Sequence, residues 1–343
     1  MSAAFEIPFG EWEERAQEHV DHSKYSKLAL SLDEYGWLPL IRATYHDENL
    51  TNNWYIKKCS LEHWIMYCDE ILPTVEPAIL KAICRGDVNA AVKGNADLRK
   101  MLQVYEERPE GMHAIYLRKM TVGINEEALL IDEARRLASI AMQYANQDSS
   151  DTAADEAYAI DKVACEGAWH IRYTISGRRH FIEGSNGDVD PAKKRVLQGF
   201  SRALTRLADQ AEKENKTHIP FLQDVGYATK GSKDERKYGN GRSGTSWLLL
   251  LTKYILESWK DISTVKMHHF TIALIVDVSL GPVGQMLLSR LARAYYFAGG
   301  FTISQAGAST SILELLYRSE VERQEMFKYI RLQLSKDRID VEQ

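Results

Sequence analysis

The stretch His269-Phe270-Thr271-Ile272-Ala273-Leu274-Ile275-Val276 decides the fold, because it is apolar on both of its alternating faces. Successive side chains of a strand point to opposite faces of its sheet, so such a run is typical of a central strand covered on both sides. Asp277 ends the run, and Gly281-Pro282 is typical of a helix start. We therefore expect a buried central strand over 269–276, followed by a helix that ends at Gly299-Gly300.

The chain before and after this strand has the patterns of further strands and helices. Two strands are expected over 169–175 and 178–182, joined by the turn Ser176-Gly177, and a helix is expected to start at Pro191. Strands at 219–227 and 301–305 and a helix at 312–334 complete the second half. This alternation predicts an α/β fold, with a mixed α+β arrangement as the alternative.

The first half of the chain is mostly helical in its pattern. Apolar residues recur at helical spacing over 12–32, 61–72, 77–85 and 126–147, and the composition of 112–117 is that of a strand. The segment 146–155 is small, polar and acidic, as an exposed linker is. The sequence therefore predicts a mostly helical acidic region over 1–155 and a basic α/β region with a C-terminal helix over 156–343.

Charge is distributed unevenly between the two halves, although the total is only −5. Residues 1–160 hold 16 Lys and Arg against 27 Asp and Glu, whereas residues 161–343 hold 27 against 21. Clustered positive charge concentrates phosphate-bearing ligands, so a polyanionic partner is expected for the second half. Solvated helix faces of mixed charge are the alternative explanation.

Composition and length indicate an intracellular protein. With 343 residues, 45% of them hydrophobic, the chain can bury a large core without disulfides. The cysteines show no CxxC spacing, which favours buried thiols in a reducing compartment; they are Cys59, Cys68, Cys84 and Cys165. The N-terminus has no signal-peptide pattern, and the longest apolar runs fall short of the roughly 20 residues that a membrane helix needs. A soluble cytoplasmic protein without a membrane span is expected.

A loop over 230–244 combines cations with glycines and neighbouring aromatic residues. Cations beside aromatic rings bind a phosphate backbone and stack on bases. The expected phosphate-binding residues of the second half are Arg172, Arg178, Arg179, Arg195, Lys230, Arg236, Lys237 and Arg242, with Tyr227 and Trp247 for stacking.

Asp277 is a further candidate binding residue. Ligands of open α/β sheets gather beyond the carboxyl ends of the strands, and a predicted helix start follows Asp277 closely. The commoner role of such an aspartate is to cap the turn or helix with its own side chain. Both interpretations are open from the sequence.

Two stretches share a pattern of glycine, an aromatic residue and a downstream arginine. The first is Gly167-Ala168-Trp169 with Phe181-Ile182-Glu183-Gly184-Ser185 and Arg195, and the second is Val225-Gly226-Tyr227-Ala228-Thr229 with Arg236. They resemble the paired-strand signature of the GIY-YIG nucleases. The resemblance implies tyrosines and an arginine acting at a phosphodiester, and a glutamate on a later helix that holds a divalent metal. The helix expected at 281–298 has no acidic residue, and Gln285 is nearest to that place, so no metal site is predicted.

The leading hypothesis is a protein that acts on a nucleic-acid or nucleotide-bearing substrate, with RNA or tRNA as candidate partner. Tyr173, His180 and Glu183 are the nearest candidates for proton transfer. One alternative is a biosynthetic transferase that uses an aminoacyl-tRNA, as cyclodipeptide synthases do, and a small-molecule substrate also fits. Another is a noncatalytic binding protein. The chain contains no GxGxxG, P-loop, GxSxG or HExxH motif, so no cofactor is indicated and catalysis itself is left open.

Overall fold

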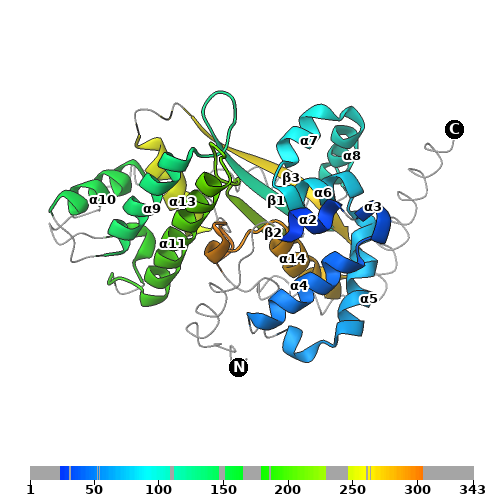
Figure 1. The fold of residues 1–343 in the computed structure, drawn as a ribbon. Coiled ribbons are helices and arrows are strands. Elements are labelled where there is room, and N and C mark those ends of the chain that lie inside the picture. The colour runs from blue at the N-terminus through cyan, green and yellow to red at the C-terminus, as the bar shows by residue number, and fades with distance from the viewer. Residues whose placement is uncertain are drawn as a thin grey trace.

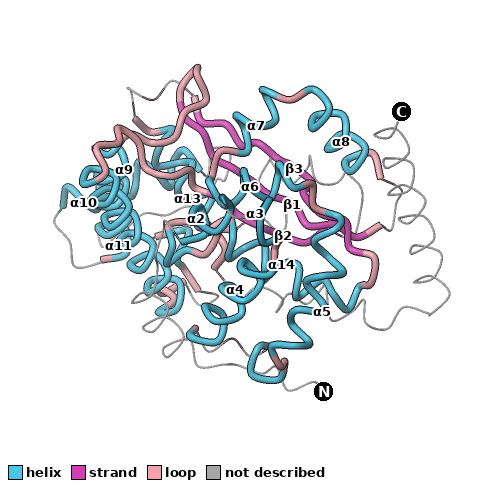
Figure 2. The backbone as a smooth tube through the Cα atoms, turned by 45° about the vertical axis from the view of Figure 1, so that its right-hand side comes forward, coloured by secondary structure: helices cyan, strands magenta, loops and turns pink. Residues whose placement is uncertain are grey.

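The computed structural model describes a three-stranded sheet surrounded by helices. The described residues are 24–30, 32–51, 53, 55–108, 112–146, 151–164, 179–184, 187–228, 246–259, 262 and 264–303. The strands are β1 (His113–Val122), β2 (Gln223–Ala228) and β3 (Val265–Ile275), in the order β2-β1-β3 with both pairs antiparallel. Figure 2 shows them side by side through the middle of the molecule. The fold is thus mixed α/β, as the sequence predicted.

The apolar run at 269–276 forms a strand, but the strand is not the central one. β1 occupies the centre, because it pairs with β2 through Leu117 and Val225 and with β3 through Leu117 and Phe270. Among the described strands β3 lies at an edge. Its end is nevertheless covered on both faces, since Leu274 packs with Tyr105 of α8 (Ala96–Glu106) and Ile275 faces Gly284 of α14 (Gly281–Leu291). The covering on both faces that the sequence pattern predicted is therefore confirmed for the end of β3, and helices provide it.

The helices form two groups on either side of the sheet (Figure 1). Near the middle and right of the view lie α2 (Lys24–Leu30), α3 (Leu32–Tyr35), α4 (Leu38–Leu50), α5 (Leu61–Ile71), α6 (Pro77–Arg85), α7 (Val88–Gly94), α8 and α14. At the left lie α9 (Ile131–Ala145), α10 (Asp151–Ala164), α11 (Pro191–Lys213) and α13 (Trp247–Glu257). Short 3-10 turns occur at Ile56–Lys58, Leu72–Thr74, His180–Ile182, Val278–Leu280 and Tyr296–Ala298.

Local signals explain where several helices begin and end. α11 starts at Pro191, where Asp190 accepts hydrogen bonds from the backbone N–H groups of residues 192 and 193. α6 spans the predicted residues and ends at Gly86, whose φ of 80° lies in the left-handed region. The predicted helices over 61–72, 77–85 and 126–147 are confirmed as α5, α6 and α9, and the predicted strands at 112–117 and 219–227 are confirmed as β1 and β2.

Four local predictions are wrong. The linker expected at 146–155 is helical from Asp151, because α10 begins there and buries Ala157 and Ile160. The strand expected at 178–182 is a 3-10 turn over His180–Ile182. The helix after Gly281 ends at Leu291, and Gly299 ends a separate 3-10 turn. In the described part of the strand expected at 301–305, which is 301–303, Thr302 makes a single bridge to Tyr295.

The acidic and basic parts of the chain share one sheet. β1 precedes the predicted boundary near residue 155, and β2 and β3 follow it. The boundary itself stays a prediction. The predicted segments 12–23, 169–175, 230–244 and 312–334 lie outside the described residues.

No helix in the described part combines the length and apolar character that a membrane crossing requires. The same part of the chain contains no group of three His, Cys, Asp or Glu side chains placed to hold a metal ion. Cys59, Cys68 and Cys84 are buried free thiols, as expected.

Candidate active-site pocket

Some of the residues predicted from the sequence lie in the left-hand helix group, far from the sheet's centre. Arg179 is buried, and its Nε donates to the carbonyl of Tyr144 at 3.1 Å. The Tyr144 hydroxyl donates to Asp161 Oδ1 at 2.5 Å, and the backbone N–H of His180 donates to Asp161 Oδ2 at 3.1 Å. These bonds join α9, α10 and the turn at 180–182. Arg179 is therefore enclosed by protein. The sequence interpretation had assumed that its guanidinium lies on the surface.

Glu183 and Arg195 lie close to the start of α11. The Glu183 carbonyl accepts a hydrogen bond from Lys193 Nζ at 2.8 Å, and Arg195 is exposed. His180 is also exposed. His180 begins the 3-10 turn and Glu183 directly follows it. Their partner in the predicted proton-transfer set, Tyr173, lies outside the described residues.

Tyr227 and Asp277 lie at the opposite side of the molecule, at one end of the sheet. β2 and β3 both run antiparallel to β1, so their carboxyl ends meet there. The Tyr227 hydroxyl is 2.6 Å from His113 Nδ1, and the two rings stack with centroids 5.5 Å apart. Asp277 accepts a hydrogen bond from the Ser279 N–H at 2.9 Å, which is the capping role considered from the sequence. Trp247, half-buried, begins α13.

The rest of the predicted set lies outside the described residues: Arg172, Arg178, Lys230, Arg236, Lys237 and Arg242. Their predicted role in binding phosphates stays a prediction. The described members divide between two separate places, and none of them lines the pocket described next.

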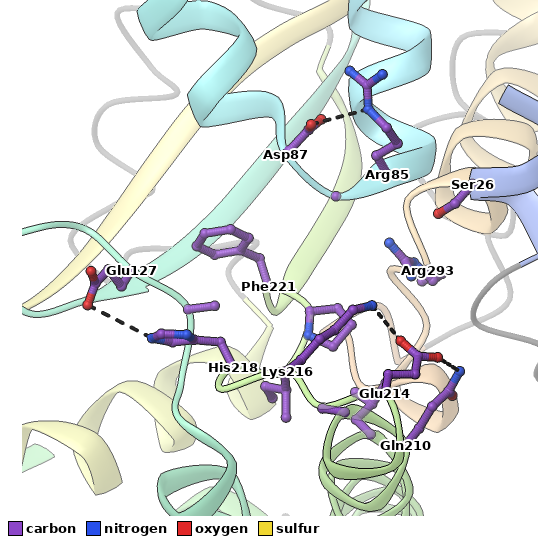
Figure 3. A pocket seen from close by; sticks show the side chains of 16 residues that line it. Ser26, Arg85, Asp87, Glu127, Gln210, Glu214, Lys216, His218, Phe221 and Arg293 are labelled. Atoms are coloured by element: carbon purple, nitrogen blue, oxygen red, sulfur yellow. Dashed lines mark hydrogen bonds and ion pairs between the residues drawn. The ribbon is translucent and has the colours of Figure 1, made fainter. Parts of the chain in front are cut away.

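A pocket of about 460 Å³ lies near the other end of the sheet, toward the start of β2. Its walls come from the turn between α6 and α7, the end of α11, the loop that leads into β2 and the segment after α14. Figure 3 shows the Phe221 ring near the centre of this region, with the Arg85–Asp87 pair on one side and Gln210, Glu214 and Lys216 on another. This volume suits a small molecule.

Both signs of charge line the pocket. Arg85 Nε is 3.2 Å from Asp87 Oδ2, and Lys216 Nζ is 2.5 Å from Glu214 Oε2. Arg293 lies on the wall beside Gly86, where a Cβ would lie 3.0 Å from the Arg293 guanidinium. Glycine is needed here because the left-handed backbone and this close approach both disfavour a side chain. The lining can therefore meet a polar ligand with both donors and acceptors.

Lys119 of β1 is the most unusual residue next to this pocket. Its side chain is fully buried, its Nζ is 3.5 Å from the Gly86 carbonyl oxygen, and the ammonium lies 3.2 Å from the centre of the Phe221 ring. Gly86 and Phe221 both line the pocket. Burial lowers the pKa of Lys119 to about 7, because water no longer stabilises its charged form; Asp87 opposes this effect and Lys93 adds to it.

The neighbouring residue of the same strand shows the contrast. Arg118 points to the opposite face of the sheet, where its guanidinium pairs with Asp224 of β2. Within the described chain, no carboxylate oxygen lies within 4 Å of Lys119 Nζ. One buried cation is thus neutralised by a partner, and the adjacent one is not.

Two buried acceptor atoms nearby also have no hydrogen-bond donor among the described residues. One is Asp87 Oδ1, on the pocket wall, and the other is Oε1 of Gln223, the residue of β2 that pairs with Lys119. Buried polar atoms are nearly always satisfied in proteins, so both oxygens are free to accept a further hydrogen bond.

Reasoning from the sequence missed this site. The strand was recognised over 112–117 only, and Lys119 was not singled out. The available signal was a lysine inside a strand with Leu117, Met120 and Val122 around it. Lysine is almost never fully buried, so its place in a buried strand indicates a special environment.

Comparison of the chain with protein-family models, with curated proteins and with solved structures finds no match. The resemblance to the GIY-YIG nucleases therefore stays a prediction from the sequence.

Proposed function

We propose that the protein binds a small polar molecule in the 460 Å³ pocket and acts on it through the side-chain amine of Lys119. The observation that supports this most is a fully buried lysine without a carboxylate partner in the described chain, in contact with two residues of the pocket wall. A group with a strongly shifted pKa next to a pocket is a candidate for catalysis.

The pocket lining indicates the character of the ligand. Arg85, Lys216 and Arg293 supply positive charge, and Asp87 and Glu214 supply acceptors. Such a mixture suits a molecule that carries an anionic group together with hydrogen-bond donors. Nucleotides and aminoacyl compounds are among such molecules, so this proposal remains compatible with the two enzymatic hypotheses from the sequence.

The proposal is tested by thermal unfolding of the full chain in the presence of nucleoside monophosphates, sugar phosphates, amino acids and 2-oxo acids. A ligand present at 100 times its Kd adds about 2.7 kcal/mol to the stability of the folded state, which raises the Tm by several degrees. At least one of these classes is expected to produce that shift in the parent protein.

Gln210→Trp distinguishes the pocket from other surfaces. Gln210 lies on the wall and donates to Glu214 at 2.8 Å, so a tryptophan there occupies the pocket without touching the strand. Gln103→Trp is the matched control, because Gln103 donates to Glu107 at 2.7 Å in the same i,i+4 geometry on α8. The ligand-induced shift is expected to disappear in Gln210→Trp and to persist in Gln103→Trp. No shift in the parent, or an equal shift in both variants, overturns the proposal.

A further inference from the structure

The surroundings of Lys119 favour a chemical role over a purely structural one. A structural buried cation acquires a carboxylate partner, as Arg118 does with Asp224 on the other face of the same strand. The contacts of Lys119 Nζ are a carbonyl oxygen at 3.5 Å and the face of the Phe221 ring. Neither of these neutralises an ammonium charge.

An amine in such a place is partly uncharged at neutral pH. Burial and the nearby Lys93 lower the pKa of Lys119 to about 7, so about half of the amine is uncharged at pH 7. An ordinary lysine, with a pKa of about 10.4, is uncharged in fewer than about one molecule in a thousand at that pH. Desolvation next to a second cation is the environment that activates lysine as a nucleophile toward carbonyl carbon.

The pocket also contains a place for a charged group of the ligand. Gly86 lies between two cations. Its carbonyl oxygen is 3.5 Å from Lys119 Nζ, and the position that a Cβ would occupy is 3.0 Å from the Arg293 guanidinium. Arginine binds carboxylates and phosphates through paired N–H groups. Arg293 therefore supplies an anion-binding group on the pocket wall, on the other side of Gly86 from Lys119.

We propose that Lys119 forms an imine with a small aldehyde or ketone that carries a carboxylate or phosphate, the charged group being held by Arg293. This rests on the proposed function of the pocket. The nitrogen lone pair attacks the carbonyl carbon, the C=O π pair moves to oxygen, and that oxygen takes up a proton as the nitrogen loses one. A second proton then reaches the hydroxyl, the C–O bond of the carbinolamine breaks as the nitrogen lone pair forms the C=N bond, water leaves, and the nitrogen releases its remaining proton. No oxidant or reductant is needed.

The ring of Phe221 has to move for this bond to form. Lys119 is fully buried, and the same ring both covers its amine and lines the pocket. Removing the ring in Phe221→Ala is therefore expected to accelerate the reaction.

The experiment traps the imine in the full chain. The protein is incubated at pH 7 with glyoxylate, a small anionic aldehyde, and sodium cyanoborohydride, which reduces an imine to a stable carboxymethyl amine. Peptide mass spectrometry then reports the labelled fraction of each lysine. Lys119 is expected to label at least about tenfold faster than the exposed Lys216 on the same pocket, a smaller ratio than the uncharged fractions of a shifted and an ordinary lysine imply, because the Phe221 ring covers the Lys119 amine. Acetaldehyde, which is neutral and of similar size, is the matched probe.

The variants separate the parts of the proposal. Gln210→Trp is expected to slow labelling of Lys119 by both aldehydes, because it occupies the pocket. Arg293→Met is expected to slow labelling by glyoxylate and to leave labelling by acetaldehyde unchanged. Equal labelling of Lys119 and Lys216 in the parent overturns the inference, as does insensitivity to Gln210→Trp. If Lys119 is unlabelled while a small molecule still raises the Tm of the parent, the imine is refuted and the pocket's function stands; if both fail, both proposals fall.

Discussion

Replacing Lys119 by methionine is expected to change how the stability of the protein depends on pH. Methionine keeps the length of the side chain and removes the group that titrates. In the folded parent, burial lowers the pKa of Lys119 to about 7, whereas in the unfolded chain the pKa is near 10.5. Between these two values the unfolded chain holds a proton that the folded protein does not. Raising the pH through this window therefore stabilises the parent, and the Lys119→Met variant lacks this contribution.

The size of the effect follows from the two pKa values. A proton bound only by the unfolded state changes the free energy of unfolding by about 1.4 kcal/mol per pH unit. From pH 7 to pH 9, the stability of the parent relative to Lys119→Met is expected to rise by about 2 kcal/mol, with little change between pH 6 and pH 7. The loss of the contact with Phe221 shifts the whole curve of the variant but not its slope.

Urea denaturation at pH 6, 7, 8 and 9 measures this difference, with the m-value checked at each pH. Lys216→Met is the control, because Lys216 lies on the same pocket with its side chain 60% exposed. Parallel stability curves for the parent and Lys119→Met between pH 7 and pH 9 would refute the reasoning. Such a result would show that the amine stays charged in the folded protein, and the chemistry proposed for it would lose its basis.

Three further predictions concern other parts of the chain. Glu48→Gln is expected to lower the free energy of unfolding in urea by roughly 3–5 kcal/mol, because Arg290 Nε, 2.9 Å from the fully buried carboxylate, would keep its charge without a partner. Gly300→Ala is expected to lower the free energy of unfolding by about 1–3 kcal/mol, because a Cβ there would lie 2.1 Å from the backbone oxygen of residue 294. Gly94→Ala is the control and is expected to be tolerated, because the space around Gly94 is open. The nucleic-acid hypothesis is tested by alanine in place of the loop cations Lys230, Lys233, Arg236 and Lys237. This change is expected to weaken RNA or DNA retention on filters more than alanine at Arg135 and Arg136 does. Equal retention by both variants and the parent would contradict the hypothesis.

Much of the local structure could be predicted from the sequence because its causes are local. A proline at the first helical position and an aspartate cap start α11 at residue 191, and a left-handed glycine ends α6 at residue 86. Alternation and β-branched residues mark the strands in the same way. Errors arose where a short apolar or polar run had two solutions, as at 151–155, where small polar residues are followed by the apolar face of α10.

The arrangement of the strands depended on distant parts of the chain. The apolar faces of β3 indicate that other elements cover it on both sides, but they do not show whether a strand pairs with one of its edges or with both. β1 becomes central because residues 223–228 return to pair with it more than 100 positions later. No pattern within either segment specifies that pairing.

By itself, the sequence determined that this protein is a mixed α/β fold with strands near 112–117, 219–227 and 269–276, and that its charge is concentrated unevenly. Only the tertiary structure decided which polar residues share a site. Arg118 and Lys119 are adjacent in the sequence and similar in charge, yet Asp224 reaches one of them and no carboxylate of the described chain reaches the other. The physical reason is that a pKa depends on desolvation and on neighbouring charges, and folding brings both from residues far away along the chain.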